Sequence, residues 1–289
     1  MSSMSAHPIP ATEAQLKKPG MSRTQKLLFF VTAWLICLMP FLFWWNTWFG
    51  RKLSNQQLTE YLHDTKKPRH IQQALVQVGE RISNRDPVAT QYYPDLVRLA
   101  TDPVEEVRNT DAWVMGQDTS GPGFHDALLK MLSDSSQMVR GNAALSLVRF
   151  GDATGRPQIL ALLQPAQITS PQTGHIIDSD RPGTAIHQGG LIAKLEYGQK
   201  QLAEIRSPIP GRIRSVVGTG ANVAGGAEVA VIDPANDQVW EALRALYLIG
   251  QTDDLPAIRP YERDLPDVSS DVRRQAAETE QAIQKRSGS

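Results

Sequence analysis

The strongest constraint on the fold of this chain is a block of sequence that occurs twice. Each position of the block that begins at Leu96 has a counterpart 32 residues later, in the block that begins at Leu128. The shared frame is Asp-x-x-x-x-Val-Arg-x-x-x-Ala, and its members are Asp102, Val107, Arg108 and Ala112, then Asp134, Val139, Arg140 and Ala144. A period of about 30 residues with helical spacing is typical of a solenoid of paired helices.

The residue types in this frame predict what each position does. The aspartates are expected to cap helix starts, the valines to point into the stack, and the alanines to let neighbouring helices approach closely. Arg108 and Arg140 are expected either to pair with the aspartate of an adjacent unit or to lie solvated on a helix face. The units resemble HEAT repeats of the short kind found in phycobilisome-lyase-like proteins, which implies an α-solenoid over residues 53–165.

A related pattern returns near the carboxyl end of the chain. Residues 237–286 contain an apolar helix, a glycine stop, an acidic turn and a second helix that begins with Val-Arg. The frame positions of this copy are Val272, Arg273 and Ala277. We expect these helices to be further HEAT-like units that pack back on the earlier ones. Trp240 and Tyr247 are seven residues apart and share one helix face, in the core or on a docking surface.

A glycine-rich stretch lies between the two helical regions. Over residues 205–234, apolar residues alternate with small or polar ones and glycines fall at the turns, which predicts several short strands. Together with 191–204, this stretch resembles a biotinyl/lipoyl-type domain, a type also found in membrane-fusion adaptors of bacterial export pumps. The resemblance implies a small barrel-sandwich over 191–234. The residues that carry it are Ser207, Pro208, Gly211, Ile213, Val216, Gly220, Val223, Gly226 and Ile232 to Pro234.

The same resemblance singles out one lysine. In carrier members of the family, a lysine on a hairpin tip receives biotin or lipoate eight residues before a proline, and Lys200 stands at that spacing from Pro208. The resemblance therefore implies Lys200 as a cofactor-attachment residue, whereas a polar turn also holds a lysine for solubility alone. Gln199 and Gln201 flank Lys200 where carriers show Met or Asp. We expect no cofactor, and an unmodified module that serves for docking or spacing.

The amino-terminal region contains an apolar run. Residues 27–45 include no charged side chain, and nineteen residues span roughly 30 Å as a helix. The run predicts a transmembrane helix over 27–49 with tryptophans at the water interface, preceded by a disordered basic tail over 1–26. Because a short basic tail before the first apolar span usually stays inside, we expect a single-pass protein with its body on the extracytoplasmic side.

The remaining candidate site is a metal site in the segment before the glycine-rich stretch. Residues 166–190 are rich in Pro, Ser, Thr and Gly, which predicts a linker. His175, Asp178, Asp180 and His187 occur in it, but their spacing matches no familiar ligand frame, so we expect no metal. The chain holds a single cysteine, which excludes an internal disulfide and a zinc site built on several cysteines.

The predicted fold class is mainly α with a small all-β module. The predicted architecture is an amino-terminal membrane helix followed by a HEAT-like solenoid that the all-β module interrupts. No catalytic motif is present, so we expect no enzyme, and the net charge of zero gives no reason to expect nucleic acid. The predicted function is a membrane-anchored scaffold or adaptor. Its partners would be the bilayer, through 27–49, and other proteins of an export or envelope complex. The alternatives are a carrier modified on Lys200 and a lyase-type or chaperone-like regulatory protein.

Overall fold

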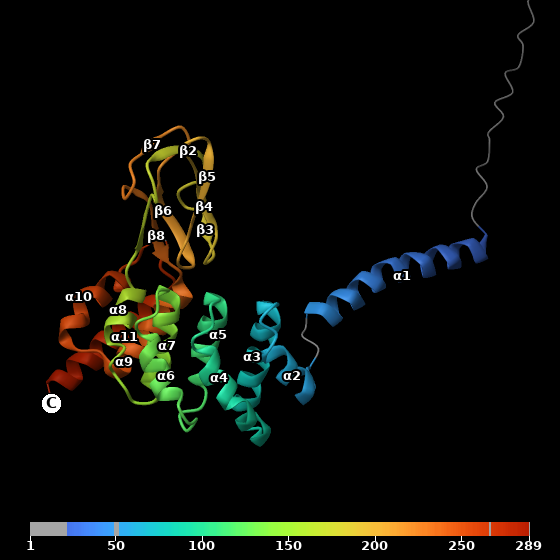
Figure 1. Ribbon diagram of the computed structural model, residues 1–289, viewed down its shortest axis with the longest axis horizontal. Helices are drawn as coiled ribbons and strands as arrows, with labels where there is room; N and C mark the ends of the chain where they lie inside the picture. The colour runs from blue at the N-terminus through green and yellow to red at the C-terminus, as the bar shows by residue number, and fades with distance from the viewer. Residues whose placement is uncertain (1–21, 49–51, 266, 289) are drawn as a thin grey trace, which may run out of the picture. The chain divides into compact units, whose positions relative to one another are not determined.

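The computed structural model describes residues 22–48, 52–265 and 267–288, and the chain divides into two units, 1–52 and 53–289 (Figure 1). The first unit contains helix α1 (Arg23–Trp48). The predicted tail over residues 1–26 lies almost wholly outside the described residues. All other helices and all strands belong to the second unit.

The membrane predictions are corrected by the structure. A helix that crosses a bilayer needs about 20 consecutive apolar residues. Among the described residues, no helix is long and apolar enough to cross a membrane. The transmembrane helix predicted over 27–49, the single-pass topology and the extracytoplasmic body that depended on it are therefore wrong.

The second unit begins with helices that pack in pairs (Figure 1). Helix α2 pairs with α3, α4 with α5 and α6 with α7, while the second helix of each pair packs against the next, α3 on α5 and α5 on α7. This is the arrangement of a helical repeat. The bounds are α2 (Asn55–Leu62), α3 (Pro68–Ser83), η1 (Pro87–Tyr92), α4 (Tyr93–Leu99), α5 (Glu105–Met115), α6 (Phe124–Met131), α7 (Gln137–Arg149) and α8 (Arg156–Leu162).

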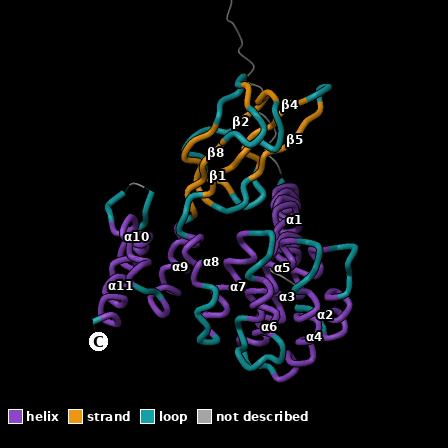
Figure 2. Tube along the Cα trace, turned by 60° about the vertical axis from the view of Figure 1, so that its left-hand side comes forward, coloured by secondary structure: helices purple, strands orange, loops and turns teal. Residues whose placement is uncertain are grey.

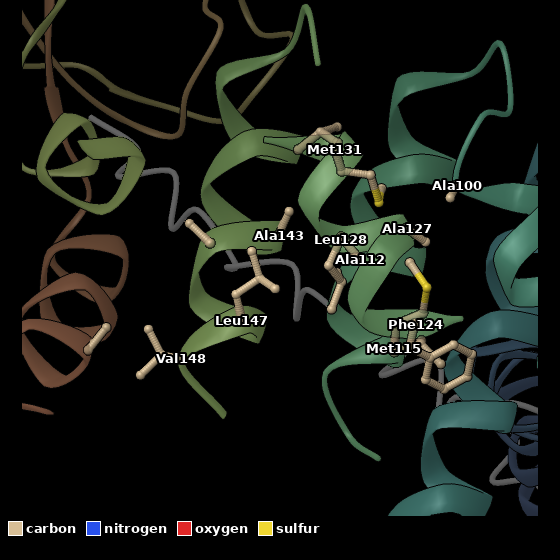
Figure 3. Packing of buried hydrophobic residues seen from close by; sticks show 14 of the residues in the cluster. Ala100, Ala112, Met115, Phe124, Ala127, Leu128, Met131, Ala143, Leu147 and Val148 are labelled. Carbon is tan, nitrogen blue, oxygen red and sulfur yellow. The ribbon is translucent and has the colours of Figure 1, made fainter. Parts of the chain in front are cut away.

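Small residues set the spacing of the stacked helices. Ala112 on α5 and Ala143 on α7 are fully buried in the core that Figure 3 shows. The Ser146 hydroxyl of α7 donates a 2.8 Å hydrogen bond to the Ala112 carbonyl, which requires close backbones. Gly116 makes this approach possible, because a Cβ at that position would lie 2.3 Å from the Ser146 oxygen.

One buried residue departs from this apolar pattern. Asp111 of α5 is fully buried, and neither of its carboxylate oxygens has a hydrogen-bond partner. The equivalent position in the next copy of the frame is Ala143. Burial, with a contribution from the charge of Asp102 and against that of Arg98, raises the pKa of the Asp111 carboxyl well above its usual range.

A stability measurement tests how far the buried Asp111 carboxyl lowers the free energy of unfolding. Because its pKa is raised in the folded state, the folded protein binds the proton more tightly, and stability falls as pH rises above the unfolded pKa near 4. Asp111→Asn keeps the shape but never ionises. We expect it to raise the free energy of unfolding at pH 7 by about 1–3 kcal/mol, and to have little effect at pH 4. An equal effect at both pH values in urea titrations would contradict this explanation.

The strands form two antiparallel sheets of four strands each. One sheet has the order β1-β8-β6-β3 and the other β5-β4-β2-β7. Figure 2 shows the strands gathered together apart from the helices. The bounds are β1 (Ala166–Thr169), β2 (Gly174–Ser179), β3 (Ala185–Ile186), β4 (Leu191–Tyr197), β5 (Gln201–Arg206), β6 (Gly211–Val216), β7 (Asn222–Val223) and β8 (Glu228–Pro234). We call these strands the β-module.

The β-module differs from the prediction in two respects. The barrel-sandwich expected over 191–234 is wrong, because the strands form two separate sheets, each with two edge strands. The predicted linker over 166–190 instead supplies β1, β2 and β3. These strands are short and separated by Pro, Ser and Gly. The alternation of apolar and polar residues in each is therefore too brief to predict a strand. Their buried side chains, Ile168, Ile176 and Ile186, join the core of the β-module.

The chain then returns to helices that continue the first stack. Helix α9 (Asn236–Ile249) packs against both α8 and α7. It is followed by η2 (Thr252–Asp254), α10 (Leu255–Ile258), η3 (Arg259–Glu262) and α11 (Ser270–Ser287), and α11 packs against α9. The α8/α9 pair therefore corresponds to the α6/α7 pair, and the β-module is inserted in the turn between its two helices.

Hydrogen bonds join the segments on either side of the insertion. The Gln238 amide of α9 donates to the Leu162 carbonyl at 2.9 Å, and the Tyr261 hydroxyl donates to the Leu163 carbonyl at 2.5 Å. The Arg156 guanidinium bonds both carboxylate oxygens of Asp254, at 2.9 and 3.1 Å. Arg156 and Asp254 are 98 residues apart in sequence, so these contacts connect the solenoid across the insertion.

A carboxyl pair lies where η3 meets α11. Partial burial, followed by a hydrogen bond to Glu280 and the charge of Glu280, raises the pKa of Glu262 to about 7, against the effect of Arg259. Because the folded pKa is raised, the folded state binds the proton more tightly, and stability falls as pH rises from about 4.5 to about 7. Glu262→Gln is expected to flatten this part of the pH profile, by under about 1 kcal/mol because the pair is partly exposed. Thermal unfolding between pH 5 and 8 measures it, and an unchanged slope would contradict the assignment.

Candidate functional site

The residues of the predicted repeat frame lie at corresponding places in the helices. Val107, Val139 and Val272 are all buried, as are Ala112 and Ala144. The copy in α11 differs by one residue, because Ala276 is fully buried there and Ala277 is only half-buried. The apolar frame residues therefore hold the helices together, and the side chains that could contact a partner stand at other positions.

The two aspartates of the frame hold the turn before a helix. Asp102 accepts a 2.8 Å hydrogen bond from the Val104 amide, and Asp134 accepts one of the same length from the Ser136 amide. Val104 and Ser136 are themselves the residues that precede α5 and α7, and Ser136 caps α7 with its own hydroxyl. The aspartates thus order the turn and do not cap the helix directly.

The two frame arginines have different partners: Arg108 connects two adjacent units, whereas Arg140 bonds backbone carbonyls of its own unit. The Arg108 guanidinium donates to both carboxylate oxygens of Asp134, Nε at 2.6 Å and Nη2 at 2.9 Å. Partial burial pushes the pKa of Asp134 upward, but the hydrogen bonds from Arg108 and Ser136 outweigh it, so the pKa lies below its usual range. Arg140 donates to the carbonyls of Asp134 and Ser135 at 2.7 and 2.9 Å.

The frame does not continue unchanged beyond Arg140. The position 32 residues after Asp134 is Ala166, the first residue of β1, so the frame stops where the β-module begins. Arg273 of α11 forms an ion pair with Asp264 of the preceding loop. The sequence left open whether Arg108 and Arg140 are paired or solvated. The structure places Arg108 in an ion pair with the aspartate of the adjacent unit, whereas Arg140 bonds backbone carbonyls of its own unit.

Lys200 lies on an exposed turn. It follows Gly198 in the tight connection between β4 and β5 and is itself in the left-handed region, at φ 60°. The candidate metal residues are spread over β2 and the loops that follow. His175 bonds the Asn222 side chain at 3.1 Å, and Asp178 faces Lys194 at 3.5 Å. Within the described ranges, no group of three or more His, Cys, Asp or Glu side chains is placed to hold a metal.

One surface feature is a groove across the second helices of the repeats. A hollow of about 270 Å³ lies over α5, α7 and α9, and a second of about 520 Å³ lies over α9 and α11. They share Arg244 and Leu248, so they form one surface, which we call the helix groove. Its lining includes Trp113, Leu145, Arg149, Glu241, Arg244, Tyr247, Leu248, Glu278 and Lys285.

Large apolar side chains are exposed in the helix groove. Trp113 and Tyr247 are each 42% exposed, and Leu248 is 61% exposed. The Trp113 ring lies against α3, where a Cβ at Gly79 would be 3.0 Å from the ring. Because the Trp113 ring packs partly against α3 and stays partly exposed, it offers a contact surface that loses little side-chain freedom on binding.

The sequence identified only part of this surface. Tyr247 lies in the groove, whereas its predicted companion Trp240 packs against the core and carries the Arg244 guanidinium over its ring, 4.6 Å from the centroid. Trp113 and Leu248 were missed. The signal for Trp113 was its position next to Ala112, which turns it away from the stack when Ala112 points into it.

Comparisons with known proteins place the chain in no family. No family model matches it, and no curated protein matches. Among solved structures, an engineered protein is 16% identical, with a TM-score of 0.40, over 79% of this chain and 78% of its own. A designed armadillo repeat protein is 14% identical, with a TM-score of 0.40, over 78% of this chain and 80% of its own. Likenesses this weak carry no argument about function.

Proposed function

We propose that this protein is a non-enzymatic scaffold that binds another protein in the helix groove. The observation that carries the proposal is the exposure of Trp113, Tyr247 and Leu248 on one continuous concave surface. Apolar and aromatic side chains of this size on a soluble surface mark interaction sites, particularly when polar residues surround them. A stacked solenoid also offers an extended face for a partner.

Site-specific cross-linking tests this proposal. A photoreactive phenylalanine analogue in place of Leu248 sits in the groove, and the same analogue in place of Leu202, which is 60% exposed on β5, serves as the matched control. We expect discrete protein adducts from position 248 in cells, and their loss when Trp113→Ala is added. Adducts from position 202 alone, or none from position 248, would remove the support for the groove as a binding site.

A second candidate function is that of a carrier modified on Lys200. The observation that favours it is the placement of Lys200 on the exposed turn between β4 and β5. The intact mass of protein purified from its native cells distinguishes the two candidates. An added biotinyl or lipoyl mass, absent from Lys200→Arg, supports the carrier. An unmodified mass supports the use of the β-module for docking or spacing.

The other predicted roles depend on the resemblances alone. A place in an export or envelope complex stays a prediction, and so does a lyase-type or chaperone-like role. Identification of the proteins cross-linked at position 248 addresses both, because a pigment-bearing partner would favour the second role and an envelope protein the first.

A further inference from the structure

We infer that the helix groove takes an extended protein segment in which one large apolar side chain is flanked by carboxylates. This inference rests on the proposed function and adds the chemistry of the partner.

The shape of the groove favours an extended chain. The two hollows run across α5, α7, α9 and α11, and neighbouring helices lie about 8–10 Å apart. The groove is therefore about 25–30 Å long, which an extended segment of about eight or nine residues spans. The hollow over α5, α7 and α9 measures about 270 Å³. That space suits a single large side chain against Trp113 and Leu248. A whole helix, which is about 10 Å across, is too wide for it.

The charges beside this hollow favour acidic groups in the partner. Arg149 is exposed, and its guanidinium contacts only neutral acceptors among the described residues, the Gly116 carbonyl at 3.3 Å and the Gln117 side chain at 3.0 Å. The Arg244 guanidinium lies over the Trp240 ring, 4.6 Å from its centroid, and its carboxylate neighbour is Glu241, at 3.6 Å. That ion pair is about half exposed, which makes it weak.

The remaining charges of the groove lie over α9 and α11. They are Glu278 and Lys285, of opposite sign. The part of the groove around Trp113 and Leu248 therefore contains two guanidinium groups and one carboxylate. In the rest of the groove the positive and negative charges are equal in number. A guanidinium binds a carboxylate through paired hydrogen bonds, so a segment with Asp or Glu beside its apolar side chain complements the groove, and one with Lys or Arg is repelled.

Binding of synthetic peptides to the full chain tests this inference. The probes are labelled peptides of about nine residues with a central Trp, flanked by Glu in one, by Gln in the second and by Lys in the third. We expect the Glu peptide to bind at least about tenfold more tightly than the Lys peptide, with the Gln peptide between, and to weaken as salt rises. Arg149→Gln with Arg244→Gln is expected to lower the affinity for the Glu peptide about tenfold. The control, Arg274→Gln, removes an arginine that is 69% exposed on α11 outside the groove lining, and should change nothing.

The outcomes separate the inference from the proposed function. Equal or tighter binding of the Lys peptide, or no effect of the two arginine substitutions, would overturn the acidic specificity while cross-linking at position 248 still supports a binding groove. If none of the three peptides binds, the inference is wrong whatever the cross-linking shows. If cross-linking at position 248 also fails, the proposed function fails with it.

Discussion

Asp254→Ala is expected to lower the free energy of unfolding by about 2–4 kcal/mol, the largest effect that we predict for a single polar side chain. Asp254 is only 3% exposed and accepts two hydrogen bonds from Arg156 and one from the Gln251 amide, at 2.8 Å. The substitution leaves the Arg156 guanidinium, which is 26% exposed, without its carboxylate. The cost is that of an uncompensated, partly buried charge together with three lost hydrogen bonds.

Asp253→Ala is the matched control, because Asp253 is the exposed neighbour in the same short helix. It should change the free energy of unfolding by less than about 0.5 kcal/mol. Urea titration of both variants provides the comparison. Similar losses in the free energy of unfolding for Asp254→Ala and Asp253→Ala would mean that the contact between Arg156 and Asp254 does not hold the two parts of the solenoid together.

Gly116→Ala is expected to destabilise the protein by about 1–3 kcal/mol. The new Cβ would lie 2.3 Å from the Ser146 hydroxyl oxygen and 2.7 Å from the Ser146 Cβ, so α5 and α7 must separate. Separation also breaks the hydrogen bond from Ser146 to the Ala112 carbonyl. The residue has φ −66°, so the cost arises from crowding and not from the backbone conformation.

Gly218→Ala is the control for Gly116→Ala, since a Cβ there meets nothing within 4 Å. It should be nearly neutral in the same denaturation experiment. Relief of the Gly116→Ala loss in a Ser146→Gly background, which removes both the hydroxyl and the Cβ of Ser146, would identify the crowded pair. An unrelieved loss would place the strain elsewhere.

The sequence was sufficient to predict the repeats because their signal is local and occurs twice. Val107 and Val139 stand at equal places in two helices, and each helix needs the same buried contacts. The partner of Arg108 was harder to predict, because the sequence pattern around an arginine on a helix surface is the same whether it pairs with Asp134 or is solvated. The pairing depends on the distance between two units, which no single unit specifies.

The strands and the groove were predicted less well, for different reasons. Strands β1 and β3 are short, and they become part of a sheet only through pairing with β8 and β6, which follow at least 25 residues later in the chain. Leu248 and Trp113 lie on helices separated by the whole β-module, so their meeting in one groove depends on how α9 packs on α7. The membrane helix was predicted from apolar composition over 27–49, and the described helices do not meet the requirement for a span.

Excision of the β-module tests most directly whether one solenoid continues through the insertion. Ala166 and Ile232 are paired across β1 and β8, so a short Gly-Ser linker can replace residues 167–231 without moving the helices. Hydrogen exchange followed by mass spectrometry then reports on α9 and α11. We predict that their amides remain protected in the shortened protein, as in the full chain, because α9 packs directly on α7 and α8. Exchange of α9 and α11 at unfolded rates, with α5 and α7 still protected, would contradict the continuous solenoid.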